Sequence, residues 1–192
     1  MKIIIINGQG GAGKDSFVKF CQKHNDYCKI FNYSTIDFVK DVARKCGWDG
    51  RKTQRARKFL SDLKDLISEY NDAPYCNVVT RIKNTLYHYN INDKSTENLI
   101  FFIHSREPQD IERWVKDFQA RTLLIHRFDG KVFQNHADRD VYTIDYDYII
   151  KNDGTLEELE EKAREFIKEI KQDGWQSIDE NEIFDMYYEE IE

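Results

Sequence analysis

The feature that most constrains this chain is a run of four isoleucines, Ile3 to Ile6, that leads directly into a glycine-rich segment. Gly8, Gly13 and Lys14 match the spacing G-x-x-x-x-G-K of a phosphate-binding loop. Glycines let successive backbone N–H groups point at phosphate oxygens, and the following helix adds its free amides and positive dipole end. Lys14 is expected to reach the β- and γ-phosphates. The predicted nucleotide-binding residues here are Gly8, Gly10, Gly11, Ala12, Gly13, Lys14, Asp15 and Ser16.

Composition excludes several classes of protein. A third of the 192 residues are charged and the net charge is −6, which argues against general nucleic-acid binding. We find no apolar run of the roughly 18–20 residues that a membrane span needs, and the N-terminal apolar run is too short for a secretory signal. The four cysteines form no C-x-x-C pair. We therefore expect a cytoplasmic protein with reduced thiols and no membrane association.

The hydrophobic pattern predicts alternating strands and helices. Continuous apolar runs, typical of a sheet covered on both faces, are separated by stretches of helical period. Thr155 and Glu158 form a capping box that opens the last long helix. The alternation predicts the α/β fold class, with a parallel sheet. The expected strands are 2–7, 29–33, 99–104, 122–127 and 148–150, and helical periodicity marks 36–43, 56–70, 111–118 and 156–170.

We expect one main domain over residues 1–170, and two segments of the chain depart from the alternation of strands and helices. About 65 mostly helical residues separate the second and third strands, more than a simple crossover needs. A helical region over residues 35–95 is therefore well placed to hold a second substrate. Residues 173–192 carry eight carboxylates and neither Lys nor Arg. We favour a docked C-terminal helix over residues 171–192; a partner-binding tail is the alternative.

The motif Gly13-Lys14-Asp15-Ser16 resembles the loop of phage-type deoxynucleoside monophosphate kinases and animal-type phosphomevalonate kinases. Residues 146–159 are similar to the last strand, loop and helix of that P-loop kinase group and of dephospho-coenzyme A kinases, and residues 102–107 extend the likeness to the middle of the chain. The resemblance implies a three-layer P-loop kinase fold with a five-stranded sheet, ATP and Mg²⁺ as cofactors, and an acceptor-binding helical insertion. It also implies that Asn152 and Gly154 lie beside the donor adenine.

Phosphoryl transfer to an acceptor that is already anionic needs no general base, but it needs cations around the moving group. Lys14 is expected to serve the donor. Arg106 and Arg127 follow the third and fourth strands at the ligand-binding edge, and Arg106 is the candidate to bridge donor and acceptor. Residues 127–141, with Lys131 and Arg139, resemble a lid that closes over the transferring phosphate. Surface ion pairs are the alternative explanation for each arginine.

A basic cluster marks the expected acceptor region, with five Lys or Arg among residues 51–58. Guanidinium groups suit the oxygens of a monophosphate. Arg55 and Arg57 point about 200° apart on a helix, so the whole cluster cannot face one ligand. Our candidates for binding the acceptor phosphate are Arg44, Arg55 and Arg57. Trp48, Tyr70 and Tyr75 are possible stacking partners of a base, although core packing is the simpler role.

The predicted magnesium ligands are Asp15 and Ser16. Asp15 occupies the place where most phosphate loops carry Ser or Thr, and a carboxylate is a good hard-oxygen ligand. His104 stands at the end of the third strand, where an Asp often orients the metal. Glu107 or Asp37 are possible substitutes, and Asp37 is also a candidate catalytic residue; a helix-capping role is its alternative.

These features together predict ATP- and Mg²⁺-dependent transfer to a small phosphorylated acceptor, with a (deoxy)nucleoside monophosphate giving the diphosphate as our first choice. One alternative is another metabolite, phosphomevalonate-like or with a hydroxyl acceptor as in dephospho-coenzyme A. A hydroxyl would need a base, which makes Asp37 the discriminating residue. Another alternative is a nucleotide-binding ATPase or switch module.

Overall fold

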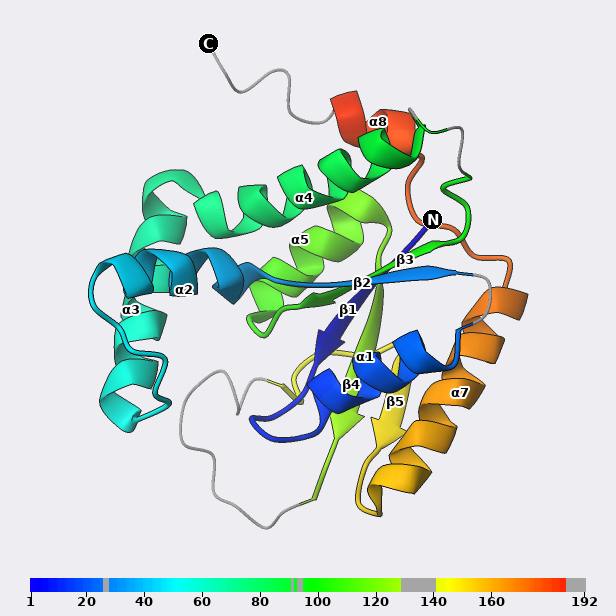
Figure 1. Ribbon diagram of the computed structural model, residues 1–192, viewed down its shortest axis with the longest axis horizontal. Coiled ribbons are helices and arrows are strands. Elements are labelled where there is room, and N and C mark those ends of the chain that lie inside the picture. Colours follow the sequence, from blue (N-terminus) through cyan, green and yellow to red (C-terminus); the bar gives the residue numbers. More distant parts are fainter. Residues whose placement is uncertain (26–27, 91, 93–94, 129–140, 186–192) are drawn as a thin grey trace.

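The computed structural model describes residues 1–25, 28–90, 92, 95–128 and 141–185. Its centre is a five-stranded parallel sheet with the strand order β2-β3-β1-β4-β5 (Figure 1). Because all strands run the same way, their carboxyl ends lie along one edge. The strands are β1 (Lys2–Asn7), β2 (Lys29–Ser34), β3 (Leu99–His104), β4 (Arg121–His126) and β5 (Tyr148–Lys151).

The isoleucine run of β1 supplies both faces of the sheet. Ile3 and Ile5 belong to the core on one face, and Ile4 and Ile6 belong to the core on the other. This follows from the alternation of side chains along a strand. All six residues of β1 are buried, as expected for the middle strand of a sheet with helices on both sides.

Each face of the sheet is covered by a pair of helices. Helices α1 (Lys14–Lys23) and α7 (Leu156–Gln172) cover one face with residues such as Phe17 and Phe166. Helices α4 (Ala73–Asn90) and α5 (Pro108–Phe118) cover the other with residues such as Ile82 and Trp114. The α/β fold class is therefore confirmed, with a parallel sheet between two helical layers.

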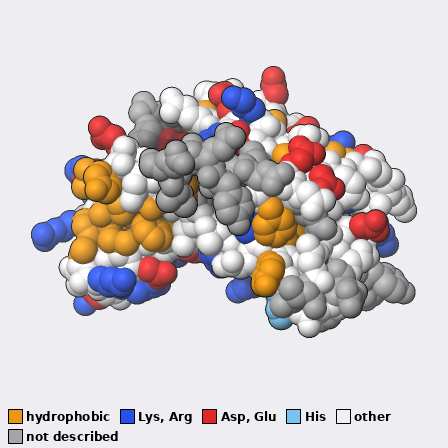
Figure 2. All heavy atoms as spheres, turned by 90° about the horizontal axis from the view of Figure 1, so that it is seen from above, with side chains coloured by type: hydrophobic (Ala, Val, Ile, Leu, Met, Phe, Trp, Pro, Cys, Tyr) orange, Lys and Arg blue, Asp and Glu red, His pale blue; other side chains and the backbone are white. Residues whose placement is uncertain are grey.

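The insertion between β2 and β3 contains α2 (Thr35–Lys45), α3 (Gln54–Asn71) and α4. Helix α2 begins directly after β2, at the carboxyl edge of the sheet, and packs beside α4 (Figure 1). Helix α3 has no fully buried residue, and its exposed hydrophobic side chains are Phe59, Leu66 and Tyr70. Figure 2 shows hydrophobic side chains gathered at the end of the molecule where α3 lies.

The C-terminal part returns to the core. Helix α8 (Glu180–Asp185) packs beside α4, Ile183 is fully buried, and Lys83 Nζ donates a hydrogen bond to the Phe184 carbonyl oxygen at 3.2 Å. None of the described helices is long and apolar enough to cross a membrane. Cys21, Cys28, Cys46 and Cys76 are free thiols.

Candidate phosphoryl-transfer site

The loop between β1 and α1 requires glycine at two positions for a steric reason. A Cβ atom on Gly8 would lie 2.3 Å from the Ile125 carbonyl oxygen, and one on Gly13 would lie 2.4 Å from Asn152 Nδ2. Both glycines also have positive φ, 145° and 98°. A Cβ on Gly10 would meet nothing within 4 Å, so this side of the loop is open to a ligand.

The loop is braced from the neighbouring strands. The buried side chain of Asn152 donates from Nδ2 to the Ala12 carbonyl oxygen at 2.8 Å, and its backbone N–H donates to the His126 carbonyl oxygen at 2.7 Å. Asn7 Nδ2 donates to Tyr146 Oη at 2.8 Å. Burial raises the pKa of the Tyr146 hydroxyl to about 12. Asn152 therefore supports the phosphate loop itself, and its contact with the adenine stays a prediction, as does that of the exposed Gly154.

The Lys14 ammonium lies inside the curve of the loop. Its Nζ donates to the carbonyl oxygens of Gly8 and Gln9, the second at 2.9 Å. Asp15 and Ser16 follow in the first turn of α1, and the Asp15 side chain is 84% exposed. An open glycine loop, a lysine within it, a helix N-terminus and two oxygen donors fit a magnesium–nucleotide complex. Lys14 and the loop amides would hold the phosphates, and Asp15 with Ser16 would hold the metal.

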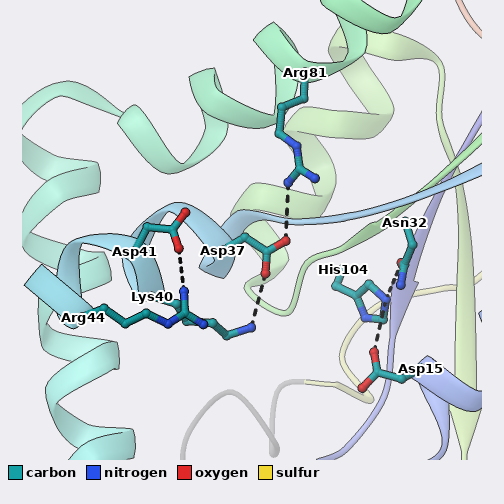
Figure 3. Close-up of polar contacts among 8 residues, drawn as sticks. All are labelled: Asp15, Asn32, Asp37, Lys40, Asp41, Arg44, Arg81 and His104. Atoms are coloured by element: carbon teal, nitrogen blue, oxygen red, sulfur yellow. Dashed lines mark hydrogen bonds and ion pairs between the residues drawn. The ribbon is translucent and has the colours of Figure 1, made fainter. Parts of the chain in front are cut away.

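His104 ends β3 beside this loop. Its Nε2 lies 2.8 Å from Asn32 Oδ1 and 3.8 Å from Asp15 Oδ1 (Figure 3). The imidazole is only 14% exposed, and burial lowers its pKa to about 4. His104 is therefore neutral at pH 7, and Nε2 carries the proton because the amide oxygen of Asn32 only accepts.

The charges that act on His104 come from two directions. Asp15 and Lys14 belong to the phosphate loop and α1, whereas Asp37 and Lys40 belong to α2. The strand-end histidine thus lies between the loop and a second polar region on α2. Two residues were predicted as substitutes for a strand-end Asp at this position. Asp37 acts electrostatically on His104, whereas Glu107 is the N-cap of α5.

That second region is a polar pocket of about 450 Å³ between α2 and α4. Four of the five α2 residues that line it, Asp37, Lys40, Asp41 and Arg44, follow the helical spacing i, i+3, i+4, i+7, which places them on one face. Asn77 and Arg81 face them from α4, one turn apart. The pocket is lined by Asp37, Phe38, Lys40, Asp41, Arg44, Asn77 and Arg81.

All five charged side chains that line the pocket take part in ion pairs (Figure 3). Asp37 Oδ1 lies 3.3 Å from Lys40 Nζ, and Asp37 Oδ2 lies 3.4 Å from Arg81 Nη1. Arg44 Nη1 lies 2.5 Å from Asp41 Oδ1. Two predicted residues, Asp37 and Arg44, are therefore brought into one pocket. Lys40, Asn77 and Arg81 were not predicted, although the spacing of Asp37, Lys40, Asp41 and Arg44 on one helix face was a usable signal.

The other predicted cations occupy different places. Arg106 lies two residues beyond β3 and is half-buried, and Arg127 directly follows β4 and is exposed. Both therefore follow the carboxyl ends of strands, and their roles stay predictions. Lys131 and Arg139, with most of the expected lid at 127–141, lie outside the described residues.

The basic cluster and the aromatic candidates contribute little to the pocket. Arg55 and Arg57 are exposed on α3 and do not line it. Tyr75 is buried beneath the Arg113 guanidinium, whose carbon lies 3.7 Å from the ring centre. Trp48 Nε1 donates to the Arg51 carbonyl oxygen at 3.1 Å, and Tyr70 is exposed on α3. Whether Arg55 and Arg57 bind an acceptor remains a prediction.

No protein-family model and no curated protein matches this chain. Among solved structures, shikimate kinase from Aquifex aeolicus is similar over 90% of this chain and 99% of its own, with 12% identity and a TM-score of 0.47. TT1252 from Thermus thermophilus is similar over 88% and 97%, with 15% identity and a TM-score of 0.49. Shikimate kinase from Acinetobacter baumannii, solved with shikimate, is similar over 92% and 96%, with 12% identity and a TM-score of 0.45. Such identities are too low to transfer site residues to this chain.

Proposed function

We propose that this protein is an ATP- and Mg²⁺-dependent kinase that transfers a phosphoryl group to a small phosphorylated acceptor, with a (deoxy)nucleoside monophosphate as the first candidate. The observation that carries the proposal is the position of His104. The phosphate loop lies on one side of it and the polar pocket between α2 and α4 on the other. A donor site and an acceptor site are thereby adjacent at one edge of the sheet.

On the donor side, the loop amides and Lys14 bind the triphosphate, and Asp15 with Ser16 hold Mg²⁺. When bound, the metal neutralises charge on the phosphates. Lys14 leaves the Gly8 and Gln9 carbonyl oxygens, to which it donates here, for phosphate oxygens. Arg106 and Arg127, beyond β3 and β4, supply further positive charge at the transferring group.

On the acceptor side, the pocket offers Lys40, Arg44 and Arg81 to an anion. A phosphate acceptor is deprotonated enough to attack without a base, so the demand is to bring two anions together. Cations of the pocket meet that demand for the acceptor, as Lys14 does for the donor.

The direct test incubates the protein with ATP, Mg²⁺ and each common ribo- and deoxyribonucleoside monophosphate in turn, and measures diphosphate formation. We expect rapid transfer to one acceptor or a small group, and Lys14→Ala is expected to abolish it while leaving the far-ultraviolet circular dichroism unchanged. Slow phosphate release at a rate that no acceptor changes would favour an ATPase or switch module instead.

A hydroxyl acceptor is the second candidate, because a carboxylate, Asp37, lies in the same pocket. A base at that place would take the proton of an attacking hydroxyl. Asp37→Asn separates the two candidates, since it would abolish transfer to a hydroxyl but spare transfer to a phosphate.

A further inference from the structure

Arg81 differs from the other cations of the pocket in how it is held. Its guanidinium carbon lies 4.0 Å from the centre of the Tyr33 ring, so the group rests on an aromatic face. Tyr33 is buried, and its hydroxyl lies 2.9 Å from Thr85 Oγ1, which itself donates to the Arg81 carbonyl oxygen at 2.9 Å. The ring is thereby fixed to the same helix that carries the arginine. Arg81 is pre-positioned before any ligand arrives.

The carboxylate partner of Arg81 is held loosely. The distance of 3.4 Å from Arg81 Nη1 to Asp37 Oδ2 exceeds the roughly 2.7–2.9 Å of a strong charge-assisted hydrogen bond. Lys40 Nζ, on the other oxygen of Asp37, is also distant at 3.3 Å. A guanidinium has five N–H donors in a planar fork. An anion with better geometry can therefore replace or share this contact.

The three arginines predicted for the acceptor region, Arg44, Arg55 and Arg57, are less suitable. Arg44 makes a close ion pair of 2.5 Å with Asp41, and its side chain is 57% exposed. Arg55 and Arg57 are exposed on α3 and do not line the pocket. The guanidinium carbon of Arg44 lies 5.7 Å from the centre of the Trp48 ring, farther than the 4.0 Å that separates Arg81 from Tyr33. A more exposed arginine loses more side-chain entropy on binding than one already fixed against a ring.

We propose that Arg81, supported by Tyr33, is the residue that binds the anionic group of the acceptor, a compact phosphate ester, and that Asp37 occupies this group in the free protein. The inference rests on the proposed function, because it assigns a residue to the acceptor site of that reaction. It is supported by the pocket's lining, in which Phe38 is the one apolar side chain among cations, carboxylates and an amide. Such a lining suits a phosphate better than a base, which stacks on aromatic surface.

The test compares Arg81→Met and Arg81→Lys with wild type, measuring the KM for the accepted monophosphate and the KM for ATP. Arg81→Met keeps an apolar stem on Tyr33 but removes the charge, and we expect the acceptor KM to rise about 10- to 100-fold with the KM for ATP unchanged. Arg81→Lys should restore only part of the acceptor affinity that Arg81→Met loses, because an ammonium cannot bind two phosphate oxygens at once as a planar guanidinium does.

Arg164→Met is the matched control. Arg164 lies on α7, pairs with Glu161 at 3.0 Å and is 42% exposed, close to the 39% of Arg81. Arg164→Met should leave the KM for the monophosphate and the KM for ATP unchanged. If Arg57→Met raises the acceptor KM and Arg81→Met does not, the anion is bound by the basic cluster and our inference is wrong.

A binding experiment separates this inference from the proposed function. The phosphate loop is filled with a non-hydrolysable ATP analogue and Mg²⁺, and each monophosphate is then titrated calorimetrically into wild type and Arg81→Met. Binding by wild type that Arg81→Met loses supports the inference even if no transfer occurs, in which case only the proposed reaction fails. If wild type binds no monophosphate, or if both proteins bind equally, the inference is overturned.

Discussion

Asn152 donates a hydrogen bond of 2.8 Å to the carbonyl oxygen of Ala12, and so joins the end of β5 to the phosphate loop. Both groups are buried. The same Asn152 side chain would collide with any Cβ at position 13. The loop's shape is therefore set by a residue 140 positions away in the sequence, as well as by its own glycines.

Asn152→Asp is the sharpest test of this support. An ionised carboxylate has the same shape but cannot donate, so two acceptors would face each other in a buried place. We expect the free energy of unfolding to fall by about 1–3 kcal/mol and the affinity for ATP to fall as well, since negative charge now stands beside the phosphate site. Urea unfolding and calorimetric titration with an ATP analogue measure the two effects.

The control for that change is Asn84→Asp, because Asn84 is exposed on α4. This variant adds the same charge away from the loop. The free energies of unfolding and of ATP binding should stay within about 0.5 kcal/mol of the wild-type values. Equal behaviour of the two variants would mean that the Asn152 side chain does not support the loop.

The glycines of the loop give a second prediction, in which two identical substitutions have different effects. Gly13→Ala combines a φ of 98° with a Cβ 2.4 Å from Asn152, and should lower the free energy of unfolding by more than about 1 kcal/mol. Gly10→Ala meets no atom within 4 Å and should leave the stability of the free protein nearly unchanged. Because that open side is where we expect phosphates, Gly10→Ala should still weaken ATP binding. Thermal unfolding with and without the nucleotide distinguishes these outcomes. A Gly10→Ala protein that binds ATP normally would show that the phosphates do not bind at the open side of the loop.

Much of the fold was predictable because it depends on local pattern. Four isoleucines form β1 as predicted, and the N-cap half of the predicted capping box was confirmed, since Thr155 Oγ1 accepts a hydrogen bond from the Glu158 N–H at 3.2 Å. Strand β4 begins at Arg121, one residue before the predicted start. The pattern missed Arg121 because its charge is satisfied by tertiary contacts, with Nη1 donating to Tyr148 Oη at 2.6 Å.

The site was predictable only where its chemistry lies in one short motif. The glycine loop between β1 and α1 has that property, whereas the polar pocket depends on how α2 packs beside α4. Asp37 and Arg81 are 44 residues apart, and Arg81 rests on Tyr33 of a strand. No periodicity links these positions. The basic cluster at 51–58 was conspicuous in the sequence, but Arg55 and Arg57 lie on the exposed α3, outside the pocket.

The last prediction concerns the pH dependence of stability that His104 contributes. Its pKa is about 4 in the folded protein, against an ordinary value of 6.5 for an unfolded chain, because burial disfavours the imidazolium. Between these two values the unfolded chain binds more protons than the folded one. The free energy of unfolding should therefore fall as the pH decreases from 6.5 to 4, with no further contribution from this group below that range.

His104→Gln isolates this effect, because glutamine keeps a polar N–H group for Asn32 but does not titrate. The two proteins share every carboxylate, so their difference in unfolding free energy reports on His104 alone. We expect that difference to change by on the order of 3 kcal/mol at most between pH 7 and pH 4, with wild type losing more. Urea unfolding of both proteins in the absence of nucleotide, at intervals across this range, measures it. Parallel curves would show that the pKa of His104 is the same in the folded and unfolded protein, and the desolvated imidazole that we place between the loop and the pocket would have to be abandoned.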